Sequence, residues 1–141
     1  MEEKFFQEED PKEEKKYLIN QAAIMIKFES LNKSEQFIRI LKKKKLSGKY
    51  FTIYFDKFRN SNNNLNISFV MKKKIGNAVK RNKIKRKLKA AVQKISKEKH
   101  LINLNYIYVI FGKNNVYKDK FVNVLEDVNE TFKKIKKMDK S

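Results

Sequence analysis

The chain has no cysteine and a single histidine, His100, among its 141 residues. Disulfide bonds and cysteine-ligated zinc are therefore excluded, and a lone histidine supplies neither a histidine-based metal site nor a His–Cys catalytic pair. With only three glycines, the sequence has no phosphate-cradling glycine loop, and it has no nucleophile elbow. We interpret His100 as a loop residue and expect no catalytic residues and no metal site in this protein.

Long hydrophobic runs are also missing. No segment reaches the ~18 apolar residues that a membrane span requires; the nearest, residues 17–28, contains Asn20, Gln21 and Lys27. The first ten residues are acidic, where a secretory signal would be basic. We therefore expect a soluble protein, and the lack of cysteine agrees with a reducing, cytoplasmic setting.

Acidic residues are few: 16 Asp and Glu face 35 Lys and Arg, which gives a net charge of +19. Such a chain repels itself unless a polyanion offsets its field, so nucleic acid is the first candidate partner and an anionic membrane surface the second. Seven of the acids lie in residues 1–16. We expect residues 1–28 to form an acidic, partly disordered extension that is either solvated or folded back on the basic surface, residues 29–138 to form one domain, and residues 139–141 to form a tail.

Periodicity predicts an α+β domain. A capping-box pattern, Asn32 with Glu35, predicts a helix at about 33–43. Alternation predicts a strand at 49–56, with Phe51, Ile53 and Phe55 on one side and Tyr50, Thr52 and Tyr54 on the other. A second alternating strand, 65–71, follows the polar turn 60–64, so we expect these two strands to form a hairpin.

The second half of the chain adds a strand and two helices. Residues 105–111 are almost wholly apolar, as in a strand covered on both faces. A final helix is predicted from residue 118, with Glu126, Asp127 and Glu130 on its solvated side and an apolar stripe of Phe121, Leu125, Val128, Phe132 and Ile135. The predicted order is helix, two or three strands, a basic helix, strand, helix.

The basic helix is the most informative segment. Residues 72–89 hold ten Lys or Arg and no acid, with apolar residues at helical spacing: Ile75, Val79, Ile84 and Leu88. The stripe extends through Ala91, Val92 and Ile95, and the opposite side carries Asn82, Arg86, Lys89 and Gln93. A helix that is buried on one side and uniformly basic on the other is suited to neutralising phosphates.

Within this helix the side chains suit different contacts. Arg81 and Arg86 can grip phosphates through paired hydrogen bonds, whereas the lysines, Lys87 among them, act as point charges. Asn82 is either a reader of a base edge, a 2′-hydroxyl or a metal-bound water, or a capping amide. Tyr50 and Tyr54 could stack on single-stranded RNA or could be ordinary strand tyrosines.

The run Gly76-Asn77-Ala78-Val79-x-Arg81-Asn82-Lys83-Ile84-Lys85-Arg86, preceded by Lys73-Lys74-Ile75, closely resembles the signature of the bacterial ribonuclease P protein component. The element order from about Leu31 to Lys137 is similar as well. The resemblance implies a small α/β sandwich of the ribosomal protein S5 domain 2-like kind, a mixed β-sheet with helices packed on it. Its basic helix lies in a left-handed β-α-β crossover, which is rare.

The resemblance also implies a function. The protein would be a subunit of the ribonucleoprotein that removes the 5′ leader of precursor tRNA, with the catalytic centre and most of the Mg²⁺ held by the RNA. The expected partners are the catalytic RNA and the leader, with no membrane and no protein partner. Its RNA-binding positions correspond to Lys73, Lys74, Asn77, Lys80, Arg81, Asn82, Lys83, Lys85, Arg86 and Lys89. Its leader cleft corresponds to Phe37, Leu41, Thr52 and Tyr54.

Four departures from the family pattern bear on these contacts. Leu41 replaces a second cleft aromatic, Lys83 replaces an arginine, Ser30 replaces an arginine before Leu31, and the strand end reads Val70-Met71-Lys72-Lys73-Lys74. Two other function classes stay open at this point. A structural RNA-binding protein of the ribosome would share the charge and fold, and a protein-only nuclease would require a carboxylate cluster.

Overall fold

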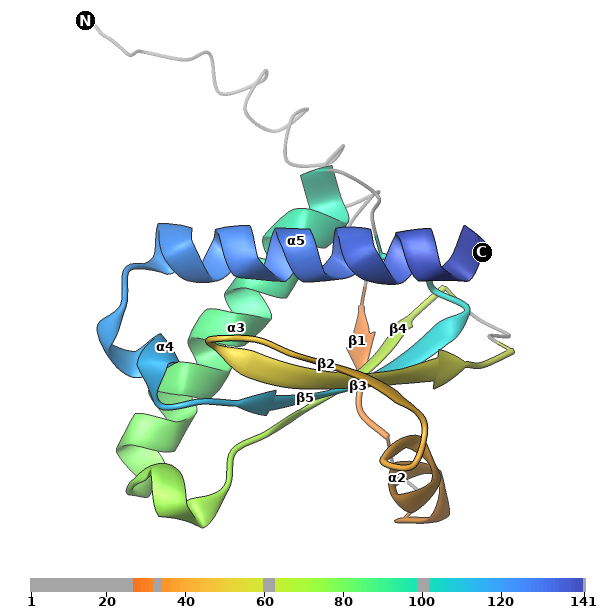
Figure 1. Ribbon diagram of the computed structural model, residues 1–141. Helices are drawn as coiled ribbons and strands as arrows, with labels where there is room; N and C mark the ends of the chain where they lie inside the picture. Colours follow the sequence, from red (N-terminus) through yellow and green to blue (C-terminus); the bar gives the residue numbers. More distant parts are fainter. Residues whose placement is uncertain (1–26, 32–33, 60–62, 99–101, 141) are drawn as a thin grey trace, which may run out of the picture.

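The computed structural model describes residues 27–31, 34–59, 63–98 and 102–140 (Figure 1). Its elements are β1 (Phe28–Glu29), α2 (Ser34–Ile40), β2 (Lys44–Ser47), β3 (Phe51–Lys57), β4 (Leu65–Val70), the 3-10 turn η1 (Lys73–Ile75), α3 (Ala78–Glu98), β5 (Tyr106–Gly112), α4 (Asn115–Lys118) and α5 (Phe121–Lys140). In Figure 1, α3 and α5 cover one face of the sheet and α2 lies against the other. This mixed sheet between helices is the α+β sandwich expected from the sequence.

The five-stranded sheet has the order β1-β4-β5-β3-β2. The predicted hairpin of β3 with β4 is wrong, because β5 lies between them, antiparallel to β3 and parallel to β4. The turn that was expected to close the hairpin, residues 60–64, lies partly outside the described residues. Instead, β3 pairs antiparallel with β2, a four-residue strand that the sequence analysis missed.

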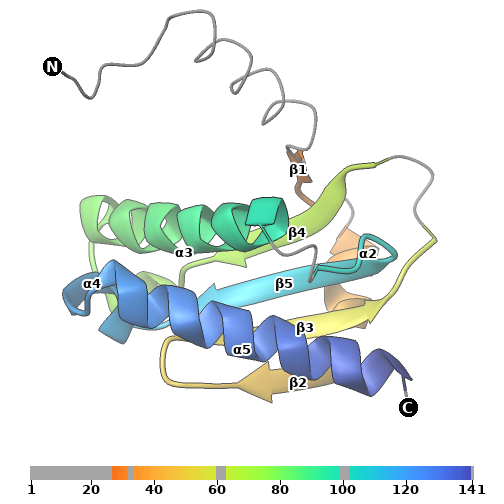
Figure 2. The same ribbon diagram turned by 90° about the horizontal axis from the view of Figure 1, so that it is seen from above.

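The chain passes from β4 through α3 to the parallel neighbour β5. Figure 2 looks down on the sheet with α3 and α5 in front of it, and β4 and β5 both run from right to left. When those strands are turned to point upward, β5 lies to the left of β4, so the β4-α3-β5 crossover is left-handed, as the resemblance implied. This route lays α3 across the sheet.

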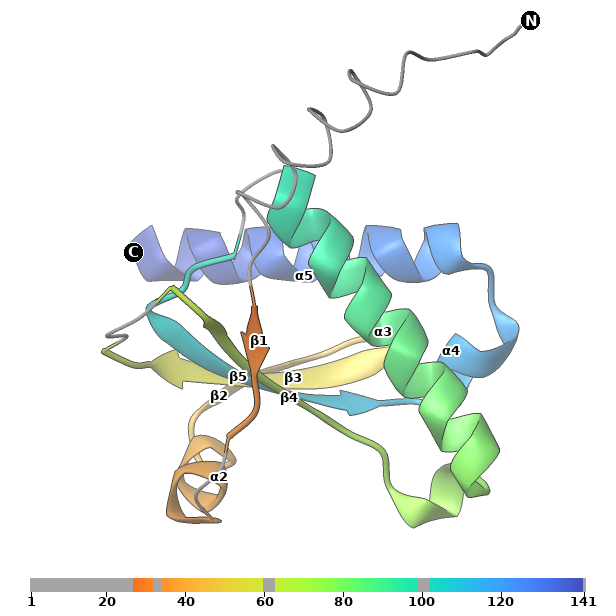
Figure 3. The same cartoon turned by 180° about the vertical axis from the view of Figure 1, so that it is seen from behind.

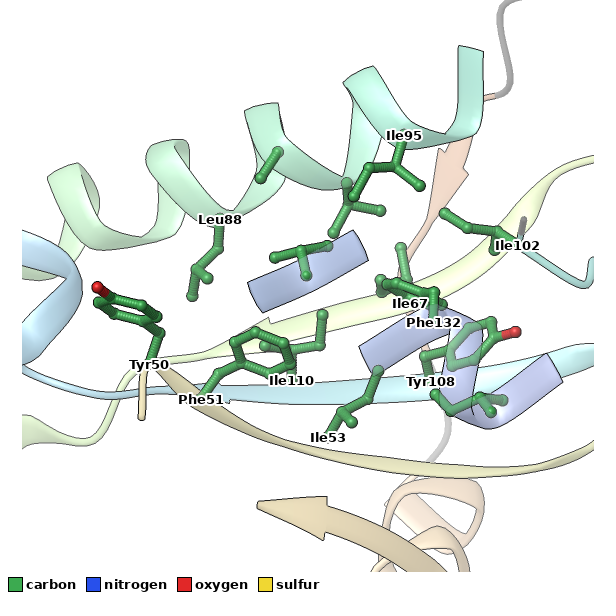
Figure 4. Close-up of a cluster of buried hydrophobic side chains, with 14 of the residues drawn as sticks. Tyr50, Phe51, Ile53, Ile67, Leu88, Ile95, Ile102, Tyr108, Ile110 and Phe132 are labelled. Carbon is green, nitrogen blue, oxygen red and sulfur yellow. The ribbon is translucent and has the colours of Figure 1, made fainter. Parts of the chain in front are cut away.

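Strand β5 is buried on both sides, as its apolar run predicted. Tyr106, Tyr108 and Ile110 face the larger core with α3 and α5, whereas Ile107 and Val109 face the smaller core with α2. Figure 4 shows the larger core, where Tyr108 of β5 lies near Phe132 of α5 and below Leu88 and Ile95 of α3. The rings of Tyr108 and Phe132 meet edge to face at 5.3 Å.

Helix α3 buries the predicted stripe from its second turn onward, and every member is at most 4% exposed: Ile84, Leu88, Ala91, Val92 and Ile95. The predicted stripe begins too early in the sequence. Val79 is 64% exposed, because the first turn of α3 extends beyond the sheet edge, and Ile75 belongs to η1.

Helix α5 docks through Val128, Phe132 and Ile135, as predicted, but its stripe begins at Val124. Phe121, placed in the stripe by the sequence, is 37% exposed at the first turn. Asp127 is not on the solvated side, since its carboxylate lies against the β2–β3 turn, 3.4 Å from where a Cβ on Gly48 would stand. Burial raises the pKa of this carboxyl.

The first helix ends a few residues earlier than expected, and two other elements cross the expected segment limits. Helix α2 ends at Ile40 rather than near residue 43, since Lys44 and Lys45 pair with β3 instead. The predicted cap Asn32 and His100 lie outside the described residues. Strand β1 crosses the boundary expected between residues 28 and 29, and α5 runs two residues into the expected tail.

Tyr50 does not lie on the outer face with Tyr54. It precedes β3, is 4% exposed, and joins the larger core beside Phe51. Its carbonyl accepts a hydrogen bond from the Lys113 N–H, and its hydroxyl reaches Asp119, the residue that follows α4.

No helix in the described ranges is long and apolar enough to cross a lipid bilayer.

Two valines of α3 test this packing. We expect Val92→Ala to lower the free energy of unfolding by about 2 kcal/mol, because two methyl groups leave a closed core. Val79→Ala, the matched control on the exposed first turn, should change it by less than about 0.5 kcal/mol. Urea unfolding followed by circular dichroism measures both values, and equal losses would contradict the assigned burial.

Candidate nucleic-acid interface

The entry to α3 is fixed by three residues. Gly76 has φ 155°, and a Cβ there would stand 2.8 Å from Cδ of Lys80. The Asn77 side-chain oxygen accepts a hydrogen bond from the Lys80 backbone N–H at 2.9 Å, so Asn77 caps the helix. The Arg81 Nε donates to the Gly76 carbonyl at 3.1 Å. Two residues predicted to bind RNA, Asn77 and Arg81, therefore also hold the helix start in place.

Beyond this start, α3 presents a continuous polar face. Asn82, Arg86 and Lys89 are exposed and spaced by four and three residues, so they line one side of the helix, opposite the buried stripe. Lys83 and Lys85 are exposed beside this row, and Lys73 and Lys74 are exposed on η1. Arg81 is half-buried and does not belong to the row. We call Asn82, Lys83, Lys85, Arg86 and Lys89 the basic face.

Lys87 does not belong to the basic face, although the charge pattern predicted for it the same role as for its neighbours. Its ammonium turns toward α4, where it donates to the backbone carbonyls of Val116, at 2.9 Å, and of Asp119. Lys87 thus ties α3 to the segment that follows β5. Sequence reasoning missed this role because nothing in a run of lysines distinguishes the one that turns inward.

Three of the four residues expected in a cleft pack together between α2 and the sheet. Phe37, Leu41, Thr52 and Tyr54 are all half-buried. Phe37, Leu41 and Tyr54 pack on the smaller core, and the Thr52 hydroxyl lies 3.0 Å from that of Ser47. Leu41, which stands where the family pattern has an aromatic, contributes only aliphatic contact here.

The centre of this cluster is Phe111, which the sequence analysis counted only as part of a buried strand. Its ring centroid lies 5.6 Å from that of Tyr54 and 6.4 Å from that of Phe37. The ammonium of Lys72 lies 5.6 Å from the Phe111 ring, and that of Lys45 lies 6.0 Å from the Tyr54 ring. Aromatic faces bordered by cations can hold both the bases and the phosphates of a single strand. No sequence signal singled out Phe111, because the strand is apolar almost throughout and its polarity does not alternate.

A hollow of about 370 Å³ joins this cluster to η1. It is lined by Thr52 and Phe111 from the sheet, by Lys72, Lys74 and Ile75, and by residues 112–114. The hollow therefore connects the ring of Phe111 with the lysines that precede α3.

The segment between β5 and α5 is fixed from the other side by Tyr50. Its hydroxyl donates to Oδ2 of Asp119 at 2.5 Å, and Nζ of Lys49 lies 3.4 Å from the same oxygen. The hydrogen bond from Tyr50, helped by Lys49, holds the pKa of the Asp119 carboxyl below its ordinary value of 3.8. Their hydrogen bonds with Asp119 raise the pKa values of Lys49 and Tyr50.

Carboxylates do not converge anywhere in the described ranges: no three His, Cys, Asp or Glu side chains there could share a metal ion. These residues do not fit a magnesium site built by protein ligands alone, because Asp119 is held by Tyr50 and Lys49 and no second carboxylate of the described residues joins it. The described surface instead presents lysine and arginine side chains together with aromatic rings.

Comparison with known proteins gives a consistent result. The model of the Ribonuclease P family matches residues 25–136. The ribonuclease P protein component of Carboxydothermus hydrogenoformans is 29% identical over 114 residues, which cover 80% of this chain and 96% of that protein. The RNase P protein of Thermotoga maritima shares the fold with a TM-score of 0.58 at 24% identity, covering 75% of this chain and 96% of the other. A mutant RNase P protein of Staphylococcus aureus does so with a TM-score of 0.62 at 20% identity, covering 91% and 98%.

The Tyr50–Asp119 hydrogen bond predicts a pH dependence. Because the Asp119 pKa is depressed in the folded state, its stabilising effect is complete above about 3.8 and is lost as pH falls through the folded-state pKa. We expect Tyr50→Phe to lower the melting temperature at pH 6, and this deficit to shrink below about pH 3.8.

Thermal unfolding between pH 6 and pH 2 measures that deficit. Tyr117→Phe is the control, since the Tyr117 hydroxyl makes no hydrogen bond within the described part of the chain. A Tyr50→Phe deficit of the same size at both ends of the pH range would show that the carboxylate is not involved.

Proposed function

Since the chain belongs to the ribonuclease P protein family, we propose that its basic face and η1 bind the catalytic RNA, and that the aromatic cluster between α2 and the sheet binds the 5′ leader of precursor tRNA. The protein is the protein component of ribonuclease P, the ribonucleoprotein endoribonuclease of tRNA processing, and in this family the RNA performs the cleavage. The family match sets aside the alternative of a structural protein of the ribosome.

The observation that carries the RNA site is the charge of the basic face. Arg86 and its neighbours are exposed, and none of them has an acidic partner among the described residues. The buried stripe of α3 keeps these charges at fixed spacing, so binding does not have to order a flexible segment first. Phosphates that meet this face release counterions, which supplies affinity.

The leader site rests on the aromatic cluster. Phe37, Tyr54 and Phe111 offer partly exposed rings, and Lys45 and Lys72 border them. A single-stranded leader can stack its bases on such rings and place its phosphates on the two ammonium groups. Mature tRNA lacks the leader, so contacts here favour binding of the precursor.

The protein contributes to catalysis by binding and charge. Positive side chains beside the RNA reduce the repulsion between phosphates, which helps the RNA to hold the magnesium ions that its chemistry uses. Magnesium belongs mainly to the RNA in this proposal, and the protein acts in the cytoplasm.

Arg86 tests the RNA site. We expect Arg86→Ala to weaken binding of the catalytic RNA and to reduce the slope of log K against log salt concentration by about 0.7–0.9, the effect of one lost phosphate contact. Arg59→Ala, an exposed arginine beyond the end of β3, is the matched control and should change neither quantity. Filter binding at four salt concentrations measures both, and an unchanged slope for Arg86→Ala would refute this contact.

Phe37 tests the leader site. We expect Phe37→Ala to reduce the preference of the holoenzyme for precursor over mature tRNA roughly tenfold, because one stacking surface is lost. Binding to the catalytic RNA alone should not change. The control is Ile38→Ala, the next residue of α2, whose side chain is 57% exposed. Equal losses of precursor and mature tRNA binding would argue against a leader contact, provided that circular dichroism shows both variants to be folded.

A further inference from the structure

Helix α4 presents an aromatic ring to solvent. Among the Phe and Tyr residues that the structure describes, Tyr117 and Phe121 are the most exposed, with 40% and 37% of their surface accessible to solvent. The other described Phe and Tyr side chains are buried or half-buried in the two cores. The Tyr117 hydroxyl makes no hydrogen bond within the described residues, so packing and hydrogen bonding leave this ring available.

Two lysines of α3 lie against the same ring. The ammonium of Lys80 is 5.2 Å from the Tyr117 ring centroid, and that of Lys83 is 5.8 Å away. Neither lysine has an acidic partner among the described residues. A ring with two unneutralised cations beside it matches a nucleotide, whose base can stack while its phosphates meet the ammonium groups.

The position of Tyr117 is set from within the protein. Its neighbour Val116 is fully buried, and the ammonium of Lys87 binds the carbonyls of Val116 and Asp119. At the first residue of α4, the Asn115 side chain donates a hydrogen bond to the Lys49 carbonyl at 3.1 Å. Because α4 is held at both ends, a base that stacks on Tyr117 orders little further chain.

The location separates this ring from the leader cleft. Figure 3 shows α4 beside the N-terminal half of α3, with α2 at the other end of the sheet, and Figure 1 shows the same separation. An RNA strand on the basic face passes Lys83 before it reaches Tyr117, whereas a leader in the cleft lies below the opposite face of the sheet.

We propose that Tyr117, with Lys80 and Lys83, forms a stacking subsite for one unpaired nucleotide of the catalytic RNA. The subsite extends the RNA interface from α3 onto α4. It rests on the proposed function, because it takes its ligand from the RNA that the basic face binds.

A fluorescence titration tests the ligand directly. The chain contains no tryptophan, so Tyr117→Trp introduces a single reporter at the subsite. We expect catalytic RNA to quench its emission by at least half, since a stacked base quenches indole. Phe121→Trp, the control on α5, should change by less than one tenth. Precursor tRNA is titrated separately, and quenching by precursor tRNA alone, or by neither RNA, would overturn the proposal.

Binding measurements separate the subsite from the rest of the interface. We expect Tyr117→Ala to weaken binding of the catalytic RNA roughly tenfold, and Tyr117→Phe, which keeps the ring, to stay within about twofold. Phe121→Ala should bind as the wild type does. Wild-type affinity for Tyr117→Ala together with weakened Arg86→Ala would refute the subsite alone, whereas wild-type affinity for both would refute the proposed function.

Discussion

Burial of β5 on both faces is the constraint on which the rest of the molecule depends. Alternate side chains of one seven-residue strand belong to two cores, so that a helix layer must cover each side of the sheet. The larger core fixes α3 and thereby the direction of the basic face. The smaller core fixes α2 against Val109 and leaves Phe111 at its edge, between two other rings. Both proposed RNA sites therefore depend on how one strand is packed.

The division of labour among the positive charges follows from the same packing. Lys87 secures α4 from inside the protein, and Arg81 secures the loop before α3, whereas Arg86 and Lys89 are exposed and form no ion pair with any described residue. A net charge of +19 indicates a polyanionic partner, but it does not indicate which side chains contact that partner. Only the fold distinguishes a lysine that binds backbone carbonyls from one that points to solvent.

Local patterns predicted well what depends on local physics. The stripes of α3 and α5 and the alternation of β3 were read from spacing, because burial on one face imposes a period on the sequence. The strand order was not accessible in this way, since pairing of β5 with β3 and β4 joins residues that lie from 41 (Asn66 and Ile107) to 61 (Phe51 and Gly112) positions apart. Tyr50 was misplaced because alternation holds only within a strand, and it stands one residue before β3. The basic face came from the charge pattern together with the motif, whereas Phe111 was hidden in a run without alternation.

The strand order also governs how the polypeptide can fold as it is synthesised. Strands β3 and β4 share no edge with each other, and the strand that joins them is not complete until Gly112. Until residues 106–112 have left the ribosome, the β2–β3 pair and the β1–β4 pair lack the strand that joins them. During that time α3 has no complete sheet on which to pack. The sheet of the nascent chain therefore closes late, only after Gly112 has left the ribosome.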